Sequence, residues 1–275
     1  ADPFIRRSRE SGCVAQGTVD FTHQGAQTGS AKAGGAFRER AKEFMIEVYG
    51  LDGNAQDSPA WEMLFQEQNY VGLFSDYRLE KIRRCKKEDA RRQSIAAGWL
   101  LDQVLRKHGM TERTARFQTG AHGKRLLYLS DGTRADVNLS HSGGYVVCAY
   151  STGGAVGIDA ECVREDVKAL QLAKRFFAPE ESAWLEAQPK KAEAFCRLWT
   201  RKESFAKRNG DGLTMRLDQF LVLEPEDLPA HKRDTEVFFK EYERADCRIT
   251  VCAGEADFPE QIAWQKISEK SLAKL

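Results

Sequence analysis

Two acidic residues in one short segment have types and a spacing that could bind a metal ion. Asp159 and Glu161 lie two positions apart in the run Gly-Ile-Asp-Ala-Glu, residues 157–161. On a strand, such side chains point to the same face. Adjacent carboxylates repel each other unless a cation or protons neutralise them. Magnesium suits such a pair, because it takes hard oxygen ligands together with substrate phosphates. The alternative is a pair of solvent-exposed strand carboxylates.

A second set of residues has helical spacing. Trp199, Glu203 and Lys207 lie four positions apart in a segment expected to be helical, so they share one helix face. A surface ion pair between Glu203 and Lys207 would be worth only about 0.3–0.5 kcal/mol and would need no function. The large indole on the same face favours a stripe that packs against the rest of the protein.

A polar turn offers a third candidate. Residues 138–144 read Asn-Leu-Ser-His-Ser-Gly-Gly, in which a strand ends in polar side chains and two glycines allow tight backbone geometry. Ser140, His141 and backbone N–H groups could bind a phosphate there. A plain hairpin turn is the alternative. A serine hydrolase is not supported, because no G-x-S-x-G motif surrounds Ser140 or Ser142.

Basic residues concentrate in one region and recur at Lys124 and Arg125. Most are expected to lie on solvated helix surfaces, but a subset on one face could bind phosphates. The members of the first group are Arg78, Lys81, Arg83, Arg84, Lys86, Lys87, Arg91 and Arg92.

Composition excludes several classes of protein. The 275 residues carry a net charge of +1, so overall charge does not indicate a nucleic-acid partner. No apolar run approaches the roughly 20 residues of a membrane helix. The seven cysteines are scattered without a C-x-x-C pair. This favours reduced cysteines in a cytoplasmic protein over disulfides or a zinc site.

The elements that position these residues mix strands and helices, which predicts an α+β fold. Residues 1–42 have little periodic apolar pattern and are expected to be a poorly ordered extension. Strands are predicted at 44–49, 115–119, 135–139, 145–151, 155–162, 217–223, 235–242, 248–253 and 262–267. Helices are predicted at 58–68, 75–107, 167–177, 179–186 and 190–209.

A weak internal repeat suggests that the chain consists of two similar halves. Val-Cys-Ala occurs at 147–149 and again at 251–253, each time at the end of a strand-rich stretch that follows helices. Chance could produce three matching residues. If the repeat reflects duplication, the halves are residues 43–154 and 155–275.

Taken together and in this order, the segments resemble the Sfp-type 4′-phosphopantetheinyl transferases. The similarity covers about residues 44–270, and its most specific part is G-[VI]-D-x-E followed some 40 residues later by W-x-x-K-E-[SA]-x-x-K. The matching segments are 87–90 with Arg92, then 123–124, 138–143, 157–161, 173–177 and 199–207.

The resemblance implies a pseudo-two-fold fold of two similar α+β halves, with coenzyme A and Mg²⁺ in the cleft between them. It implies that Asp159, Glu161 and Glu203 are the metal ligands. Lys207 would contact the phosphate at the reacting centre, and Asp159, Glu203 and Lys207 would be the catalytic residues.

The resemblance also implies a set of residues that bind coenzyme A. Ser140 and His141 would contact its phosphates, and Lys124 would do so near the adenine end. The other expected phosphate-binding residues are Arg78, Lys81 and Arg92, together with Lys207.

Two positions depart from the family pattern. Arg125 stands where the family has proline after Gly-Lys, which removes a fixed φ from that loop. Ala160 stands between the two strand carboxylates in place of a large aliphatic residue. It should face the opposite side of the strand, where packing would adjust.

The expected reaction moves phosphopantetheine from coenzyme A to a serine of an apo acyl or peptidyl carrier protein. The protein would supply positioning and charge neutralisation, with Glu203 as the candidate base, and would act as a monomer without nucleic acid or membrane. The alternatives are a non-catalytic module that binds coenzyme A or a nucleotide, and a different magnesium-dependent phosphotransferase. The latter would be expected to bring a glycine-rich phosphate loop, and none is present.

Overall fold

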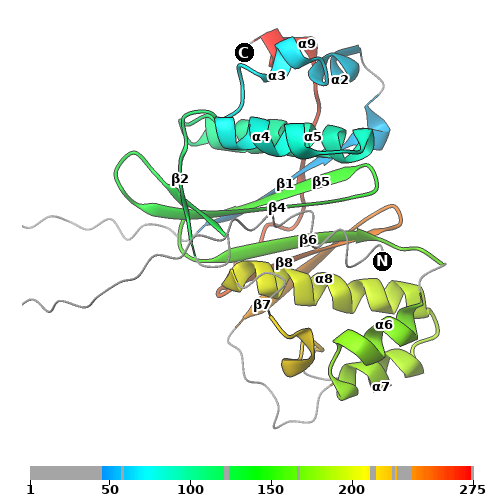
Figure 1. Ribbon diagram of the computed structural model, residues 1–275. Helices are drawn as coiled ribbons and strands as arrows, with labels where there is room; N and C mark the ends of the chain where they lie inside the picture. Colours follow the sequence, from blue (N-terminus) through cyan, green and yellow to red (C-terminus); the bar gives the residue numbers. More distant parts are fainter. Residues whose placement is uncertain are drawn as a thin grey trace, which may run out of the picture.

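Two sheets lie against each other between two groups of helices in the computed structural model (Figure 1). It describes residues 45–56, 59–120, 124–165, 168–210, 215–224, 227 and 237–273. The expected N-terminal extension, residues 1–42, lies outside the described residues, as does Gly123. The arrangement confirms the predicted α+β class.

The first sheet has six strands in the order β2-β3-β4-β5-β1-β9. Neighbouring strands are antiparallel, except that β9 runs parallel to β1. The strands are β1 (Ile46–Asp52), β2 (Arg116–Thr119), β3 (Arg125–Tyr128), β4 (Arg134–Ser142), β5 (Tyr145–Ser151) and β9 (Ala263–Gln265). The sequence pattern did not predict β3, which is short.

Helices cover the outer face of this sheet (Figure 1). The longest is α5 (Glu88–Lys107), whose apolar stripe of Ile95, Trp99, Leu100 and Val104 is buried as expected. The smaller elements are η1 (Gly53–Ala55), α2 (Pro59–Leu64), α3 (Glu67–Tyr70), α4 (Asp76–Arg84) and α9 (Glu269–Ala273).

The prediction of one continuous helical stretch over residues 75–107 is wrong. Helix α4 begins after Ser75, whose hydroxyl accepts the Arg78 N–H, and it ends at Cys85, which has extended backbone angles (φ −68°, ψ 114°). Helix α5 then begins with Glu88 and Asp89 in its first turn. Acidic residues are favourable there, because they face the positive end of the helix dipole.

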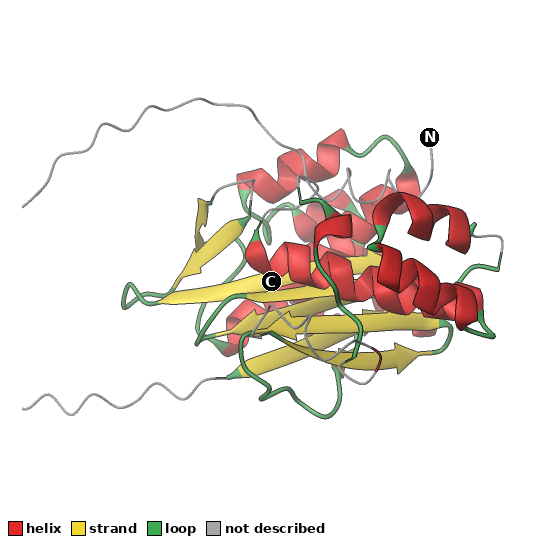
Figure 2. Ribbon diagram, turned by 90° about the horizontal axis from the view of Figure 1, so that it is seen from below, coloured by secondary structure: helices red, strands yellow, loops and turns green. Residues whose placement is uncertain are grey.

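The second sheet has three antiparallel strands in the order β6-β8-β7. Its helices lie on the face away from the first sheet, as seen also from below in Figure 2. The elements are β6 (Val156–Cys162), α6 (Ala169–Phe176), α7 (Pro179–Ala187), α8 (Lys191–Asn209), η4 (Leu217–Gln219), β7 (Phe238–Arg244) and β8 (Cys247–Ala253).

The strand predicted at residues 217–223 is wrong. Leu217–Gln219 forms a short 3₁₀ helix, and the segment is held by side chains of α8 instead of a strand neighbour. The Lys202 ammonium binds the carbonyl oxygens of Leu217 and Phe220 at 2.6 and 2.7 Å. Apolar residues in this segment therefore cover a helix, which local periodicity cannot distinguish from a strand.

An apolar layer joins the two sheets. Side chains from β1 and β5 meet side chains from β6 and β8, so the inner faces of both sheets are buried against each other. The members include Ile46, Val48, Val147, Ala149, Val156, Ile158, Ala160, Ile249 and Val251. Ala160 thus faces away from the two carboxylates, as expected.

The division of the chain at residue 155 falls between β5 and β6, which belong to different sheets. However, β9 returns to pair with β1, so the last residues of the described chain lie with the first sheet. The domain boundaries stay a prediction.

The expectation that all cysteines are reduced is wrong for one pair. Cys162 and Cys247 lie opposite each other in the register of β6 and β8 and form a disulfide. Their separation of 85 residues gives no sign of this, because strand pairing alone brings the two sulfur atoms together.

No helix in the described ranges is long and apolar enough to cross a bilayer. The cytoplasmic location and the monomeric state stay predictions.

Candidate active site

Two carboxylates of β6 face helix α8. Asp159 and Glu161 are both 6% exposed and alternate with Ile158 and Ala160, which point to the apolar layer between the sheets. The helix comes very close to the strand at Gly157, where an added Cβ atom would lie 1.9 Å from the Ser204 carbonyl oxygen. Because glycine has no side chain, the helix can place its own acidic and basic residues beside the strand carboxylates.

Lys207 lies at the centre of this group. Its ammonium donates to Asp159 Oδ1 at 2.7 Å, to Ser140 Oγ at 3.0 Å and to the Ile158 carbonyl oxygen at 3.2 Å. The Ser140 hydroxyl in turn donates to Asp159 Oδ1 at 2.8 Å. Ser140 belongs to the first sheet and Asp159 to the second, so the cluster spans both halves of the protein.

Glu203 has an altered acidity. It is half-buried one helical turn before Lys207 on α8. Loss of solvent, followed by the nearby negative charge of Asp159, raises the pKa of Glu203 to about 7, and Glu161 adds to the rise. Lys207 opposes it. Three acidic groups crowded against one lysine are the electrostatic signature of a site suited to an additional cation.

The donor set fits magnesium by its chemistry. Asp159, Glu161 and Glu203 supply the hard carboxylate oxygens that this ion prefers. The oxygens do not all lie within 4.8 Å of one another; among the described residues, only Cys162, Asp246 and Cys247 have potential ligand atoms that close together. Because both of those sulfur atoms are in the disulfide, they are not thiolate ligands.

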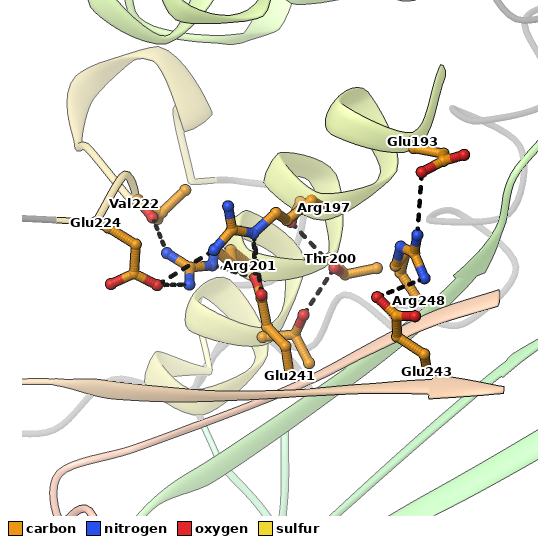
Figure 3. Close-up of polar contacts among 10 residues, drawn as sticks. Glu193, Arg197, Thr200, Arg201, Val222, Glu224, Glu241, Glu243 and Arg248 are labelled. Atoms are coloured by element: carbon orange, nitrogen blue, oxygen red, sulfur yellow. Dashed lines mark hydrogen bonds and ion pairs between the residues drawn. The ribbon is translucent and has the colours of Figure 1, made fainter. Parts of the chain in front are cut away.

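Charged side chains on the opposite side of α8 hold the helix in place. Figure 3 shows Arg197 and Arg201 projecting from the helix toward Glu241 of β7 and toward Glu224. Arg201 also donates to the Val222 carbonyl oxygen at 2.8 Å. These contacts fasten α8 to the sheet and to the segment around residue 222, so the helix presents Glu203 and Lys207 from a fixed support.

A fully buried ion pair adds to this support. Lys202 and Glu181 are both 0% exposed, and Lys202 Nζ lies 2.7 Å from Glu181 Oε2. Glu181 also accepts the backbone N–H groups of Ala178 and Val222 at 3.1 and 2.9 Å. Burial lowers the pKa of Lys202 and raises that of Glu181, while their mutual attraction opposes both shifts.

We predict that Lys202→Met destabilises the protein by about 3 kcal/mol, because it leaves the buried Glu181 carboxylate without its counter-ion and two carbonyl groups without this donor. Urea unfolding measures this loss. The double variant Lys202→Met with Glu181→Gln should recover part of the stability, since it removes the isolated charge and keeps an amide oxygen that can accept a backbone N–H group. A double variant less stable than Lys202→Met alone would contradict this account.

Three of the basic residues expected to bind coenzyme A, namely Arg78, Arg92 and Lys124, form ion pairs with carboxylates of the same chain. Arg78 is 5% exposed, with its Nε 3.5 Å from Glu112 Oε1. Arg92 donates two hydrogen bonds to Glu62, at 3.0 and 2.6 Å. This pairing lowers the pKa of Glu62.

Lys124 joins the first sheet to the second half of the chain. It binds Asp136 Oδ2 at 2.6 Å and the carbonyl oxygens of Val156 and Arg208 at 3.2 and 2.8 Å. Lys81 is half-exposed on α4, and His141 is half-buried on β4 directly after Ser140. The structure thus joins Ser140, Asp159 and Lys207 directly, while a role in ligand binding for the other basic residues stays a prediction.

Arg125, which stands where the family has a proline, packs against two aromatic rings. Its guanidinium carbon lies 4.2 Å from the centre of the Tyr77 ring and 3.9 Å from that of Phe117. A cation between two aromatic faces gains from both ring quadrupoles. The Arg125 side chain therefore ties the beginning of β3 to α4 and β2, where the family has a proline.

For two polar residues near the site, the sequence predicted no role of their own. Asp136 and Asn138 on β4 bind backbone N–H groups of β6. The available signal was a polar residue at every second position of the strand, Asp136, Asn138, Ser140 and Ser142, which indicates one polar face.

Comparison with known proteins agrees with this geometry. The family model of the 4′-phosphopantetheinyl transferase superfamily matches residues 155–254, which include β6 and α8. The chain is similar to 4′-phosphopantetheinyl transferase Sfp of Bacillus subtilis (strain 168), with 32% identity over 234 residues, or 82% of this chain and 99% of that protein.

Two further relatives have similar identity. The 4′-phosphopantetheinyl transferase ffp of Bacillus subtilis is 33% identical, covering 79% of this chain and 96% of that protein. The 4′-phosphopantetheinyl transferase psf-1 of Bacillus pumilus is 33% identical, covering 70% of this chain and 81% of that protein. The clustered acidic and basic residues of β6 and α8 therefore lie in a chain that belongs to the Sfp-type 4′-phosphopantetheinyl transferase family.

Proposed function

We propose that this protein transfers the 4′-phosphopantetheine group of coenzyme A to a serine of an apo acyl or peptidyl carrier protein. The product released is adenosine 3′,5′-bisphosphate. The observation that carries the proposal is the cluster of Ser140, Asp159 and Lys207, joined across the two sheets within 3.0 Å, with Glu203 nearby on α8. Membership of the transferase family agrees with it.

Asp159, Glu161 and Glu203 would hold Mg²⁺. When bound, the ion neutralises charge on the pyrophosphate of coenzyme A. The raised pKa of Glu203 supports this assignment. Burial and the negative charges of Asp159 and Glu161 disfavour the ionised form, and a cation at this position would stabilise it.

The protein side chains would divide the remaining work. The carrier serine oxygen forms a bond to the phosphorus that bears pantetheine, and the bond from that phosphorus to the bridging oxygen breaks. Glu203, directly or through a water, would accept the serine proton. Lys207 would stabilise the charge that develops on the leaving phosphate, because its ammonium already lies among the site oxygens.

Phosphate groups further along coenzyme A would be bound by Ser140 and His141 and by basic residues of the first half. Arg78, Lys81, Arg92 and Lys124 are the proposed contacts. Arg78, Arg92 and Lys124 would share their charge between a phosphate and the carboxylates that they bind in this structure.

Fluorescent coenzyme A, Mg²⁺ and a set of apo carrier proteins test the proposal. We expect carrier labelling by the wild-type protein, loss of labelling with a chelator and recovery when Mg²⁺ is restored. Asp159→Ala should lower the rate strongly. Labelling that survives the chelator would contradict the metal assignment, and unimpaired labelling by Asp159→Ala would contradict the role of that residue.

The same assay separates the transferase from a non-catalytic binding module. Calorimetry that detects coenzyme A binding, together with no transfer to any of several carriers, would favour the binding module.

A further inference from the structure

A row of polar side chains on β4 faces β6, the edge strand of the second sheet. Three of them accept a backbone N–H group of β6 whose residue number is greater by 20, so the two strands run parallel in a constant register. The bonds are from the Val156 N–H to Asp136 Oδ2 at 2.9 Å, from the Ile158 N–H to Asn138 Oδ1 at 2.9 Å and from the Cys162 N–H to Ser142 Oγ at 3.1 Å.

These bonds provide acceptors for N–H groups on the edge of β6 that is not paired with β8. The Val163 N–H donates to the Asp246 carbonyl oxygen at 2.9 Å, so the odd-numbered residues of β6 are the ones that bond to β8. The even-numbered N–H groups therefore point away from β8. Leaving such groups buried without an acceptor would cost stability. The side chains of β4 therefore accept the hydrogen bonds that the backbone of a neighbouring strand would otherwise accept.

Ser140 belongs to the same row but is used differently. By the constant register it lies opposite Ala160, yet its hydroxyl donates to Asp159 and accepts from Lys207. The row thus holds the two halves together and also contributes a residue to the site. Its neighbour in the row, Asn138, binds the residue that directly precedes Asp159.

Ile158 connects Asn138 to the reacting groups. Its N–H is held by Asn138, and its carbonyl oxygen accepts a hydrogen bond from Lys207 at 3.2 Å. Both contacts act on the peptide units that flank Ile158, so a shift of this residue would move Lys207 and Asp159 together. Asn138 is half-buried, and its bond to β6 is made to a backbone N–H group, not to a side chain of the site.

We propose that Asn138 is a positioning residue for phosphopantetheinyl transfer, acting through Ile158 on Lys207 and Asp159. This inference rests on the proposed function. Removing a residue that supports such groups from behind commonly costs 10–100-fold in metal affinity or activity.

The test compares variants that lack or retain an acceptor at residue 138. Asn138→Leu has a similar shape without the acceptor. Asn138→Asp and Asn138→Ser keep an oxygen, and Asp136 and Ser142 show that both side-chain types bind backbone N–H groups of β6. Asn138→Ala replaces Asn138→Leu if that variant does not fold. Tyr242→Phe is the stability control. Tyr242 lies on the outer strand β7, and the substitution removes its one hydrogen bond to the Pro259 carbonyl oxygen.

We expect Asn138→Leu to lower kcat about tenfold or more with carrier protein, and to weaken Mg²⁺ binding measured by calorimetry in the presence of coenzyme A. Asn138→Asp or Asn138→Ser should recover most of the wild-type kcat and most of the wild-type Mg²⁺ affinity. Tyr242→Phe should keep wild-type kcat and Mg²⁺ affinity. The proposal is overturned if Asn138→Leu behaves like Tyr242→Phe, or if all variants at residue 138 lose activity equally.

If the proposed function is wrong, the experiment gives a result distinct from failure of the Asn138 proposal. In that case the wild-type protein would label none of the carriers. Calorimetric binding of Mg²⁺ and coenzyme A to the same variants would still decide whether Asn138 positions the site.

Discussion

Gly157→Ala should destabilise the protein by more than about 4 kcal/mol, the largest loss of stability that we expect from a single methyl group. The added Cβ would lie 1.9 Å from the Ser204 carbonyl oxygen and 2.5 Å from the Arg208 backbone nitrogen. Both neighbours are backbone atoms inside α8, so no side-chain rotation relieves the clash. The helix and the strand would have to separate.

Urea or thermal unfolding measures this effect. Gly72→Ala is the matched control, because a Cβ there would meet no atom within 4 Å, and its stability should change by less than about 0.5 kcal/mol. Equal stability of the two variants would show that α8 and β6 do not approach as closely as described. If some Gly157→Ala protein folds, its transferase activity should also fall, since Glu203 and Lys207 move with the helix.

Glu203→Gln should lower carrier labelling by at least about 100-fold, because it removes the proposed proton acceptor and one proposed metal ligand. The same substitution should raise the stability of the metal-free protein at pH 8. Burial and the neighbouring Asp159 raise the pKa of Glu203 from 4.5 to about 7 in the folded protein. Folding therefore favours the protonated form, and this residue reduces stability as the pH rises from about 4.5 to 7.

The stability gain of Glu203→Gln should be complete above pH 7 and should vanish below about pH 4.5, where the wild-type carboxyl is protonated in both the folded and unfolded states. Unfolding curves at several pH values, measured with a chelator, test whether Glu203→Gln raises the stability and at which pH the gain appears. Glu260→Gln, a change at an 88% exposed side chain, should alter neither activity nor stability appreciably. A Glu203→Gln protein that labels carriers normally would refute the catalytic role.

Most of the secondary structure, and the strand and helix faces that carry the candidate metal ligands, were predictable from the sequence. Spacing alone places Asp159 and Glu161 on one face of a strand, and Glu203 and Lys207 on one face of a helix, because these periods are properties of the local backbone. The failures were the break between α4 and α5, the strand predicted at 217–223, β3, and the single helix predicted at 58–68, which is divided into α2 and α3. In the first two, backbone capping and side-chain bonds from α8 overrode the local apolar pattern.

The two strand carboxylates and their helical partners were thus recognised from residue type and spacing, and their ordered motifs indicated the family. Only the tertiary structure showed that Ser140 reaches Asp159 from another sheet, that Asn138 supports Ile158, and that Cys162 and Cys247 are opposite each other. These contacts join residues 19, 20 and 85 positions apart. Such contacts depend on which strand edges and helix faces are buried together, and burial is a property of the whole chain that no local pattern contains.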